Sequence, residues 1–352
     1  MTLSRRTVLG GGLSLVAGAA AAQHAGHDNL YSHLRDPAAK GVPPGAAEAV
    51  RYTLTPAPPA EDQGRWEPKA PLPIPRSEMA WATVCRGKMH VVGGYGEGRV
   101  DRNYHHVYDP TADAWTTAAA LPFGANHVGV ATIGDRIYAL GGFIEQNRAP
   151  HSQCFVWDAS TDRWESIRPL PRPRGAIGAV ALGGKIHAIG GRDVRSLDAH
   201  LVYDPASDRW SERQPVVGMR DHIGALEVDG KIHVVGGRMD NFHFNTGLHH
   251  VYDPAKDSWD ERAPMPTARS GHGAVWLSGR IFVMGGEGTR RVFAQNEAYD
   301  PKTDSWAAHA PMLTARHGLG AVSIGDTIFV AGGGPIVGGG IQSAINEAFR
   351  LG

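Results

Sequence analysis

Short apolar segments that end in a Gly-Gly pair recur along the chain at almost constant spacing. The pairs begin at Gly93, Gly141, Gly190, Gly236, Gly285 and Gly332, so successive pairs are 46 to 49 residues apart. Between residues 224 and 262 the alternation of apolar and polar positions predicts four short strands joined by turns. A period of about 50 residues with four strands per repeat is typical of a propeller blade, whose sheet buries both faces only between neighbouring blades.

A second pattern follows the first five Gly-Gly strands. An aromatic-Asp pair comes next, and a Trp stands six residues after that Asp, as in Asp109 and Trp115, Asp158 and Trp164, Asp204 and Trp210, Asp253 and Trp259, and Asp300 and Trp306. We expect these aromatic rings to fill the wedge between blades. The combined pattern resembles the kelch repeat family. This resemblance implies an all-β fold, a six-bladed kelch β-propeller that covers about residues 65–352.

The last repeat lacks one strand at the C-terminal end of the chain. It reaches a third strand near residues 346–351 and stops before any Trp strand. Residues 65–73 resemble the Trp strands of the other repeats, such as residues 258–266. We therefore expect an N-terminal strand to close the last blade and to pair an edge that would otherwise lie open.

The N-terminal residues predict export. Arg5 and Arg6 precede an apolar, Gly- and Ala-rich run that ends at Ala22, and the pair resembles a twin-arginine signal. The alternative is a general secretory signal. We expect residues 1–22 to be the signal peptide and the mature chain to be periplasmic or secreted. Residues 23–64 are rich in Pro, Ala and Gly and predict a flexible extension, in which His24, His27 and His33 are interpreted as part of a solvated tail.

Composition excludes several classes of partner. Lys plus Arg and Asp plus Glu both number 35, so no overall charge attracts nucleic acid or, after signal cleavage, a membrane surface. Cys85 and Cys154 are the only cysteines, too few for a disulfide scaffold, and we interpret them as two buried thiols.

Loop lengths indicate which face of the propeller binds ligands. The links between the first and second strands are tight, whereas those between the second and third strands vary in length and are polar, as expected of binding loops. On this face we expect ligand-binding side chains from those loops and from the links between blades, where an Arg recurs in a kelch-like turn. The predicted ligand-binding residues are His127, Arg174, Arg192, Arg220, His222, Arg238, Arg269 and Arg316. The alternative is that the recurring Arg supports neighbouring backbone.

Motifs for standard catalytic chemistry are missing from the sequence. It contains no HExxH motif, no Ser-His-Asp order and no phosphate-binding Gly-rich loop before a helix, which argues against standard hydrolase and nucleotide-binding functions. The pairs His105-His106 and His249-His250 occupy equivalent strand positions, where other repeats carry Asn296 and Asn346, and predict strand-end hydrogen bonds. We predict no metal site and no cofactor.

Three functions are compatible with these patterns. The first is binding of a small anionic or carbohydrate ligand, or of a periplasmic protein partner, on the polar loop face. The second is a sugar isomerase, because the chain resembles the bacterial kelch sialic acid mutarotase (N-acetylneuraminate epimerase), and this resemblance implies catalytic roles for Glu287, Arg290 and Arg291. The third is a copper enzyme similar to galactose oxidase. That family has seven blades and a Cys-Tyr cross-link on channel loops, and neither Cys of this chain lies on such a loop.

Overall fold

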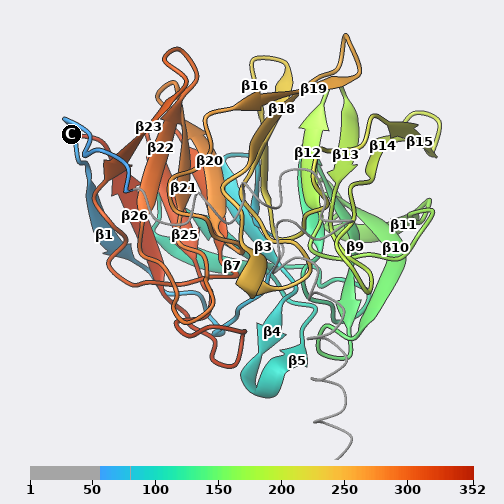
Figure 1. Ribbon diagram of the computed structural model, residues 1–352. Helices are drawn as coiled ribbons and strands as arrows, with labels where there is room; N and C mark the ends of the chain where they lie inside the picture. The colour runs from blue at the N-terminus through green and yellow to red at the C-terminus, as the bar shows by residue number, and fades with distance from the viewer. Residues whose placement is uncertain (1–55, 80) are drawn as a thin grey trace, which may run out of the picture.

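Six four-stranded antiparallel sheets are arranged as blades around a central axis (Figure 1). The computed structural model describes residues 56–79 and 81–352. The six-bladed, all-β propeller predicted from the repeat spacing is confirmed. None of the helices in these described ranges is long and apolar enough to cross a membrane. The predicted signal segment, residues 1–22, lies outside them.

The first three blades follow one another in chain order. Blade 1 comprises β2 (Thr83–Cys85), β3 (Lys88–Val92), β6 (His105–Asp109) and β7 (Ala114–Ala118). A small hairpin of β4 (Tyr95–Gly96) and β5 (Val100–Asp101), with the 3₁₀ turn η1 (Glu97–Arg99) between them, projects from the link between β3 and β6 (Figure 1). Blade 2 comprises β8 (Gly129–Ile133), β9 (Arg136–Ile144), β10 (Ala149–Asp158) and β11 (Arg163–Ile167). Blade 3 comprises β12 (Gly178–Leu182), β13 (Lys185–Ile189), β14 (His200–Asp204) and β15 (Arg209–Arg213).

The other three blades repeat the same plan. Blade 4 comprises β16 (Gly224–Val228), β17 (Lys231–Val235), β18 (His249–Asp253) and β19 (Ser258–Arg262), with the turn η2 (Phe242–Phe244) in its second link. Blade 5 comprises β20 (Gly273–Leu277), β21 (Arg280–Met284), β22 (Asn296–Asp300) and β23 (Ser305–His309). Blade 6 comprises β24 (Gly320–Ile324), β25 (Thr327–Ala331), β26 (Asn346–Arg350) and β1 (Arg65–Lys69).

Blade 6 combines strands from distant parts of the sequence. Strand β1 is antiparallel to β26, in a register that places Arg65 opposite Arg350 and Lys69 opposite Asn346 (Figure 1). Residues 56–64, the last part of the predicted extension, lie beside β23 of blade 5, where the N–H of Ala60 donates to the carbonyl of Ala308 at 2.8 Å.

A repeated pair of hydrogen bonds connects each blade to the one before it. In blade 1, the Trp115 Nε1 donates to the carbonyl of Ala70, and the N–H of Ala70 donates to Asp113, both at about 2.8–2.9 Å. The equivalent Trp and Asp residues of blades 2 to 5 hold one residue of the preceding blade in the same way. The Asp-Pro-x-x-Asp turn therefore supplies an interblade contact as well as turn geometry, a role that its sequence alone did not reveal.

The first Gly of each Gly-Gly pair lies where neighbouring backbones approach closely. Gly190 has φ +60°, and a Cβ built there would lie 2.4 Å from the carbonyl oxygen of Arg220 in the next blade. Gly183, in the turn between β12 and β13, has a nearly equal φ of +58° but open space around the Cβ position. Both positions would strain the backbone of a non-glycine residue, but only at Gly190 would the added Cβ also collide with a neighbouring atom.

We expect Gly190→Ala to lower the free energy of unfolding by about 2–3 kcal/mol, against about 1 kcal/mol or less for Gly183→Ala, because only the first adds a collision to the φ strain. Urea unfolding followed by Trp fluorescence measures both. Equal losses in the two variants would contradict this account of the Gly-Gly pair.

Candidate functional site

Six residues, one from each blade, form a ring around the channel axis on the face of the variable loops. These residues, here called the collar, are Glu78, His127, Ala176, His222, Gly271 and Gly318. Each has a positive φ, between +49° and +62°. From His127 to Gly318, the N–H of each member donates to the carbonyl of the member before it, at 2.8–3.3 Å. The backbone of the collar is thus nearly symmetric, although its side chains differ.

A second ring of six residues lies against the collar. Its side chains, like those of the collar, differ from blade to blade. It consists of the residue that follows each Gly-Gly pair, namely Tyr95, Phe143, Arg192, Arg238, Glu287 and Gly334. Each forms a β-bridge with the residue just before the collar member of its own blade, in turn Ser77, Asn126, Gly175, Asp221, Ser270 and His317. Equivalent backbone positions therefore present an acid, bases, cations and aromatic rings to one region, as expected of a site built on a repeated scaffold.

The channel below the collar is nearly filled. Blade 1 places Trp81 where the other blades have Val130 or an alanine, and its Nε1 donates to the carbonyl of Ile177 at 3.2 Å. The remaining channel cavity measures about 70 Å³. This cavity therefore has room for only a few water molecules.

A larger cavity of about 480 Å³ lies on the collar. Its walls come from the variable links of blades 1, 2, 3, 4, 5 and 6, and its volume suits a ligand of monosaccharide size. The lining residues are Glu78, Tyr95, Arg99, His127, Gln146, Asn147, Arg192, Arg238, Asp240, Asn241, Glu287, Val337 and Gly338.

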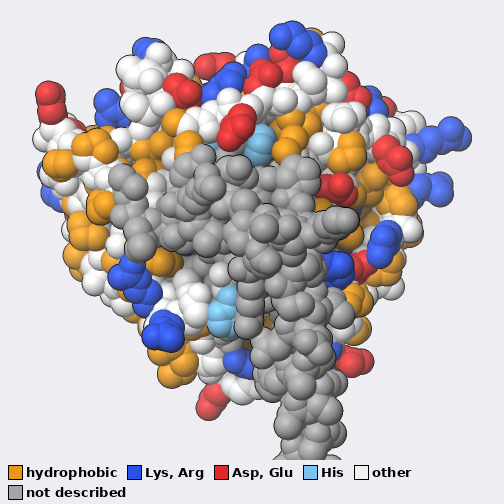
Figure 2. All heavy atoms as spheres, viewed as in Figure 1, with side chains coloured by type: hydrophobic (Ala, Val, Ile, Leu, Met, Phe, Trp, Pro, Cys, Tyr) orange, Lys and Arg blue, Asp and Glu red, His pale blue; other side chains and the backbone are white. Residues whose placement is uncertain are grey.

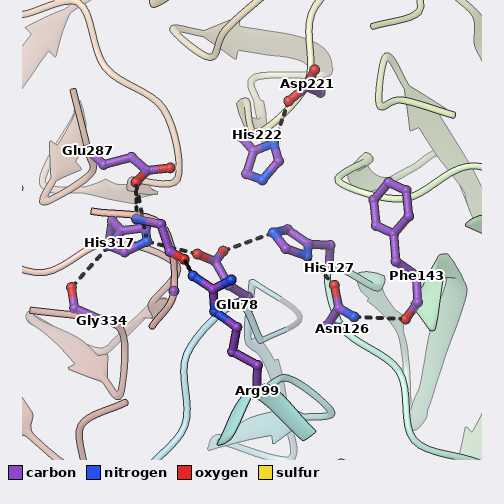
Figure 3. A network of polar contacts seen from close by, with 12 residues as sticks. Glu78, Arg99, Asn126, His127, Phe143, Asp221, His222, Glu287, His317 and Gly334 are labelled. Carbon is purple, nitrogen blue, oxygen red and sulfur yellow. Dashed lines mark hydrogen bonds and ion pairs between the residues drawn. The ribbon is translucent and has the colours of Figure 1, made fainter. Parts of the chain in front are cut away.

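Glu78 lies at the centre of a buried polar network (Figure 3). One carboxylate oxygen is 2.8 Å from His317 Nε2, and the other is 3.0 Å from His127 Nε2. Gly318 leaves room for this carboxylate, because a Cβ there would lie 2.6 Å from it. Burial raises the pKa of Glu78, but the two imidazoles outweigh burial and hold the pKa well below its usual value. Glu78 is therefore ionised at neutral pH.

His317 carries the matching positive charge. Burial lowers the pKa of its imidazole, but Glu287 and Glu78 outweigh burial and raise the pKa to about 9. Glu287 Oε2 lies 3.4 Å from His317 Nε2 and accepts a hydrogen bond from the N–H of Gly338 at 2.9 Å. This contact holds the variable link of blade 6 against the network.

Arg238 connects the other half of the network. Its guanidinium donates to Glu287 at 2.7 Å, to Asp221 at 3.1 Å and to His222 Nε2 at 2.9 Å. Burial and the charge of Arg238 lower the pKa of His222 to about 3, so this imidazole is neutral at physiological pH. His222 Nδ1 donates to Asp221 at 2.5 Å, which leaves Nε2 as the acceptor.

The tautomer of His127 is also set by its neighbour. The Asn126 amide nitrogen donates to Asp101 at 2.7 Å and to the carbonyl of Phe143 at 3.0 Å. The Asn126 amide oxygen therefore faces His127 Nδ1 as an acceptor, and Nδ1 carries the proton. His127 Nε2 points to Glu78 (Figure 3).

Arg192 is the half-buried cation of the cavity wall. Its guanidinium lies over the Phe143 ring, 5.6 Å from the ring centre, and it has no carboxylate partner within 4 Å among the residues of the described ranges. Arg99, from η1, reaches over the same cavity and donates to the carbonyl of Gly338 at 2.5 Å. The cavity thus offers a guanidinium that makes no direct ion pair with a carboxylate in the described part of the chain.

Comparison with known proteins identifies the scaffold. The Attractin/LZTR1 beta-propeller family model matches residues 89–336. The chain belongs to the Attractin/LZTR1 β-propeller family. Among solved structures, the one titled "Structure of YjhT" has a TM-score of 0.68 at 14% identity, covering 78% of this chain and 95% of that chain. This similarity shows the shared kelch-like fold alone. No curated protein matches the sequence significantly.

In this Attractin/LZTR1-type propeller, part of the predicted ligand set comes together. His127, Arg192, Arg238 and Glu287 line the cavity, and His222 lies beside them in the collar. Arg290 and Arg291 are exposed and do not line it, and the Arg291 guanidinium lies 4.9 Å from the centre of the Phe293 ring.

The recurring Arg lies elsewhere. Arg174, Arg220, Arg269 and Arg316 are 0–1% exposed and point into their own blades. Arg220, for example, donates to the carbonyls of Gly236 and Leu248 at 3.2 and 3.0 Å. The structure therefore places these four as supports for the backbone behind the collar, in place of the ligand contacts predicted for them, because each side chain turns away from the axis.

The paired His residues form contacts within the blades. His90 and His105 face each other at 2.8 Å between ring nitrogens, and His233 and His249 repeat this geometry. His106 and His250 accept from Arg76 and Arg220. Cys85 and Cys154 are buried free thiols, as interpreted from the sequence, and neither lines the cavity.

Sequence reasoning missed four network residues. Glu78, Tyr95, Asp221 and His317 were not predicted, although Glu78 and Tyr95 occupy positions equivalent to predicted ones in other blades. Aligning the repeats on the recurring Arg places Glu78 at the position of His222, and His127 has the same place in blade 2, where Ala125 replaces the Arg. That signal was present in the sequence, but the inward direction of the side chains was not.

Proposed function

We propose that the chain binds a small anionic, hydroxylated ligand of sugar-acid size in the cavity on the collar. The observation that carries the proposal is Arg192, a half-buried guanidinium in a polar cavity with no carboxylate partner in the described part of the chain. A guanidinium pairs well with a carboxylate through two parallel hydrogen bonds, and partial burial strengthens such a pair.

The rest of the wall complements the hydroxyl groups of a sugar. Gln146, Asn147 and Asn241 supply amide donors and acceptors, and Tyr95 supplies an aromatic face and a hydroxyl. Arg99 adds a second positive charge at the rim. On the coloured part of the face drawn in Figure 2, Lys and Arg side chains are interspersed with Asp and Glu side chains.

A thermal-shift comparison tests this proposal. At a ligand concentration about a hundredfold above Kd, the expected stabilisation is about 2.7 kcal/mol, a rise in Tm of several degrees. We expect this rise with glucuronate or N-acetylneuraminate but not with glucose. Arg192→Leu should abolish the rise, whereas Arg290→Leu, an exposed Arg outside the cavity, should keep it.

Two results would contradict the proposal. The first is an equal shift with neutral sugar, which would show that no cation selects the ligand. The second is loss of the shift in Arg290→Leu but not in Arg192→Leu. If no small molecule shifts Tm, a periplasmic protein partner for the loop face becomes the better proposal.

A second candidate function is isomerisation of such a sugar acid at its anomeric centre. It is favoured by Glu78 and His127, a carboxylate and an imidazole 3.0 Å apart in the cavity wall, where a proton could be exchanged with a sugar hydroxyl. Glu287 suits this role less, because its carboxylate forms an ion pair at 2.7 Å with the Arg238 guanidinium, which does not exchange protons at neutral pH as an imidazole can. Acceleration of anomer exchange in the NMR spectrum, lost in His127→Gln, would support it.

Export remains a proposal. It rests on Arg5, Arg6 and the apolar run that follows, all outside the described residues.

A further inference from the structure

We propose that Glu78, His127 and His222 form a binding site for a divalent transition-metal ion at the floor of the cavity. One ligand atom from each residue lies within 4.8 Å of the other two, and all three residues are buried. Two imidazole nitrogens and one carboxylate oxygen form a ligand set typical of Zn²⁺ and Fe²⁺. The proposal goes beyond sugar-acid binding, since it requires no organic ligand.

The contacts behind the two imidazoles support this assignment. His127 Nδ1 faces the amide oxygen of Asn126, and His222 Nδ1 faces a carboxylate oxygen of Asp221. In each case the residue just before the His fixes the ring and directs Nε2 toward the axis (Figure 3). Metal-binding histidines are commonly held in this way through the nitrogen that does not bind the ion.

The geometry of His127 and Glu78 gives a second argument. His127 Nδ1 faces the amide oxygen of Asn126, so Nε2 is the ring nitrogen that faces a carboxylate oxygen of Glu78, 3.0 Å away. An imidazole nitrogen and a carboxylate oxygen at this separation can both bind one metal ion.

Backbone strain gives a third, independent argument. Glu78, His127 and His222 have φ of +49°, +51° and +53°, whereas blades 5 and 6 have glycine at the same collar position. A non-glycine residue in this conformation costs about 1 kcal/mol or more. The collar has four such residues: Ala176, with φ +54°, carries no ligand atom, and the ligand atoms of the other three converge.

Arg238 is the group that a metal ion must displace. It donates to His222 Nε2 at 2.9 Å, so that lone pair is occupied. Its bonds to Asp221 and Glu287 could be kept when it withdraws. Arg238 and His317 oppose a cation, whereas Glu78, Asp221 and Glu287 attract it. We therefore expect Arg238→Gln, which frees His222 and removes a positive charge, to tighten metal binding by about tenfold.

Co²⁺ titration of the untagged full chain, stripped with EDTA, tests the site. Because His24, His27 and His33 could bind metal on their own, all three are replaced by Gln in every sample. We expect a visible absorption band that saturates at one Co²⁺ per chain and is removed by Zn²⁺. His127→Ala and Glu78→Gln should each weaken binding by about a hundredfold or more. The control His243→Ala changes a surface imidazole and should leave the titration unchanged.

Several results would overturn the metal site. They are a missing band, an unchanged titration in folded His127→Ala and Glu78→Gln, or weaker binding in Arg238→Gln with its circular dichroism spectrum intact. The sugar-acid shift is measured separately in EDTA. A shift that persists there while Co²⁺ fails to bind overturns only the metal site, and Co²⁺ binding without any shift overturns only the sugar-acid proposal.

Discussion

Lowering the pH from neutral to about 4 is expected to unfold the protein cooperatively, because many imidazoles are buried in their neutral form. Burial lowers the pKa of one group of these to about 4 and of another to about 3, from an ordinary value of 6.5. The first group is His90, His106, His187 and His233, and the second is His105, His200, His222, His250 and His272.

The direction of this effect follows from proton binding. Below pH 6.5 the unfolded chain binds protons that the folded chain excludes, so stability is complete above pH 6.5 and falls as the pH approaches 4. A pKa difference of two units corresponds to about 2.7 kcal/mol for each imidazole, so a few of them offset the whole stability of a typical domain. His317 acts oppositely, because its raised pKa of about 9 adds stability that is lost only as the pH rises through 9.

Urea unfolding at a series of pH values measures this dependence. We expect the unfolding midpoint to fall steeply below pH 6.5, with several protons taken up on unfolding. As a control, His187→Gln together with His200→Gln in blade 3 should reduce the number of protons taken up. A midpoint that stays constant down to pH 4.5 would show that these imidazoles titrate normally.

Arg220→Ala is expected to reduce the free energy of unfolding by about 3–5 kcal/mol, because it removes a buried hydrogen-bond donor. The side chain is 0% exposed. Its removal takes away the donor to the carbonyl of Gly236 and to the ring nitrogen of His250, leaves the carbonyl of Leu248 with the N–H of Gly236 alone, and opens a cavity. Lys, with a single ammonium group, cannot reach all three acceptors, so Arg220→Lys should recover only part of the loss.

The matched control is Arg290→Ala, which removes an exposed Arg and should change stability by less than about 0.5 kcal/mol. Chemical denaturation of both variants gives the comparison. A stable Arg220→Ala variant that had lost sugar-acid binding would restore the ligand role predicted from sequence and would refute the supporting role that its hydrogen bonds indicate.

The scaffold was predictable because its determinants are local and repeated. The Gly-Gly pairs mark where strands meet the next blade, and the Trp residues mark outer strands, so register could be counted along the sequence. The interblade role of Asp113 and its equivalents was not predictable, because an Asp at the end of a turn is explained adequately by the turn itself.

The site was only partly predictable, because the sequence does not show in which direction each side chain points. His127 and Arg220 both belong to the links between blades, yet one side chain points to the axis and the other into its blade. Spacing gives the position of a residue on the ring but not the side to which it turns. Glu78 and His317 were missed because most blades have a different residue type at each of these positions. A comparison of repeats draws attention to the residues that the blades share and away from those found in one blade.

A crystal structure of the protein with bound N-acetylneuraminate or glucuronate would show directly where the ligand binds. We expect the ligand on the collar, with its carboxylate within hydrogen-bond distance of the Arg192 guanidinium and its hydroxyls near Asn147 and Asn241. A ligand bound at another face, or one in this cavity with its carboxylate turned away from Arg192, would contradict the sugar-acid proposal.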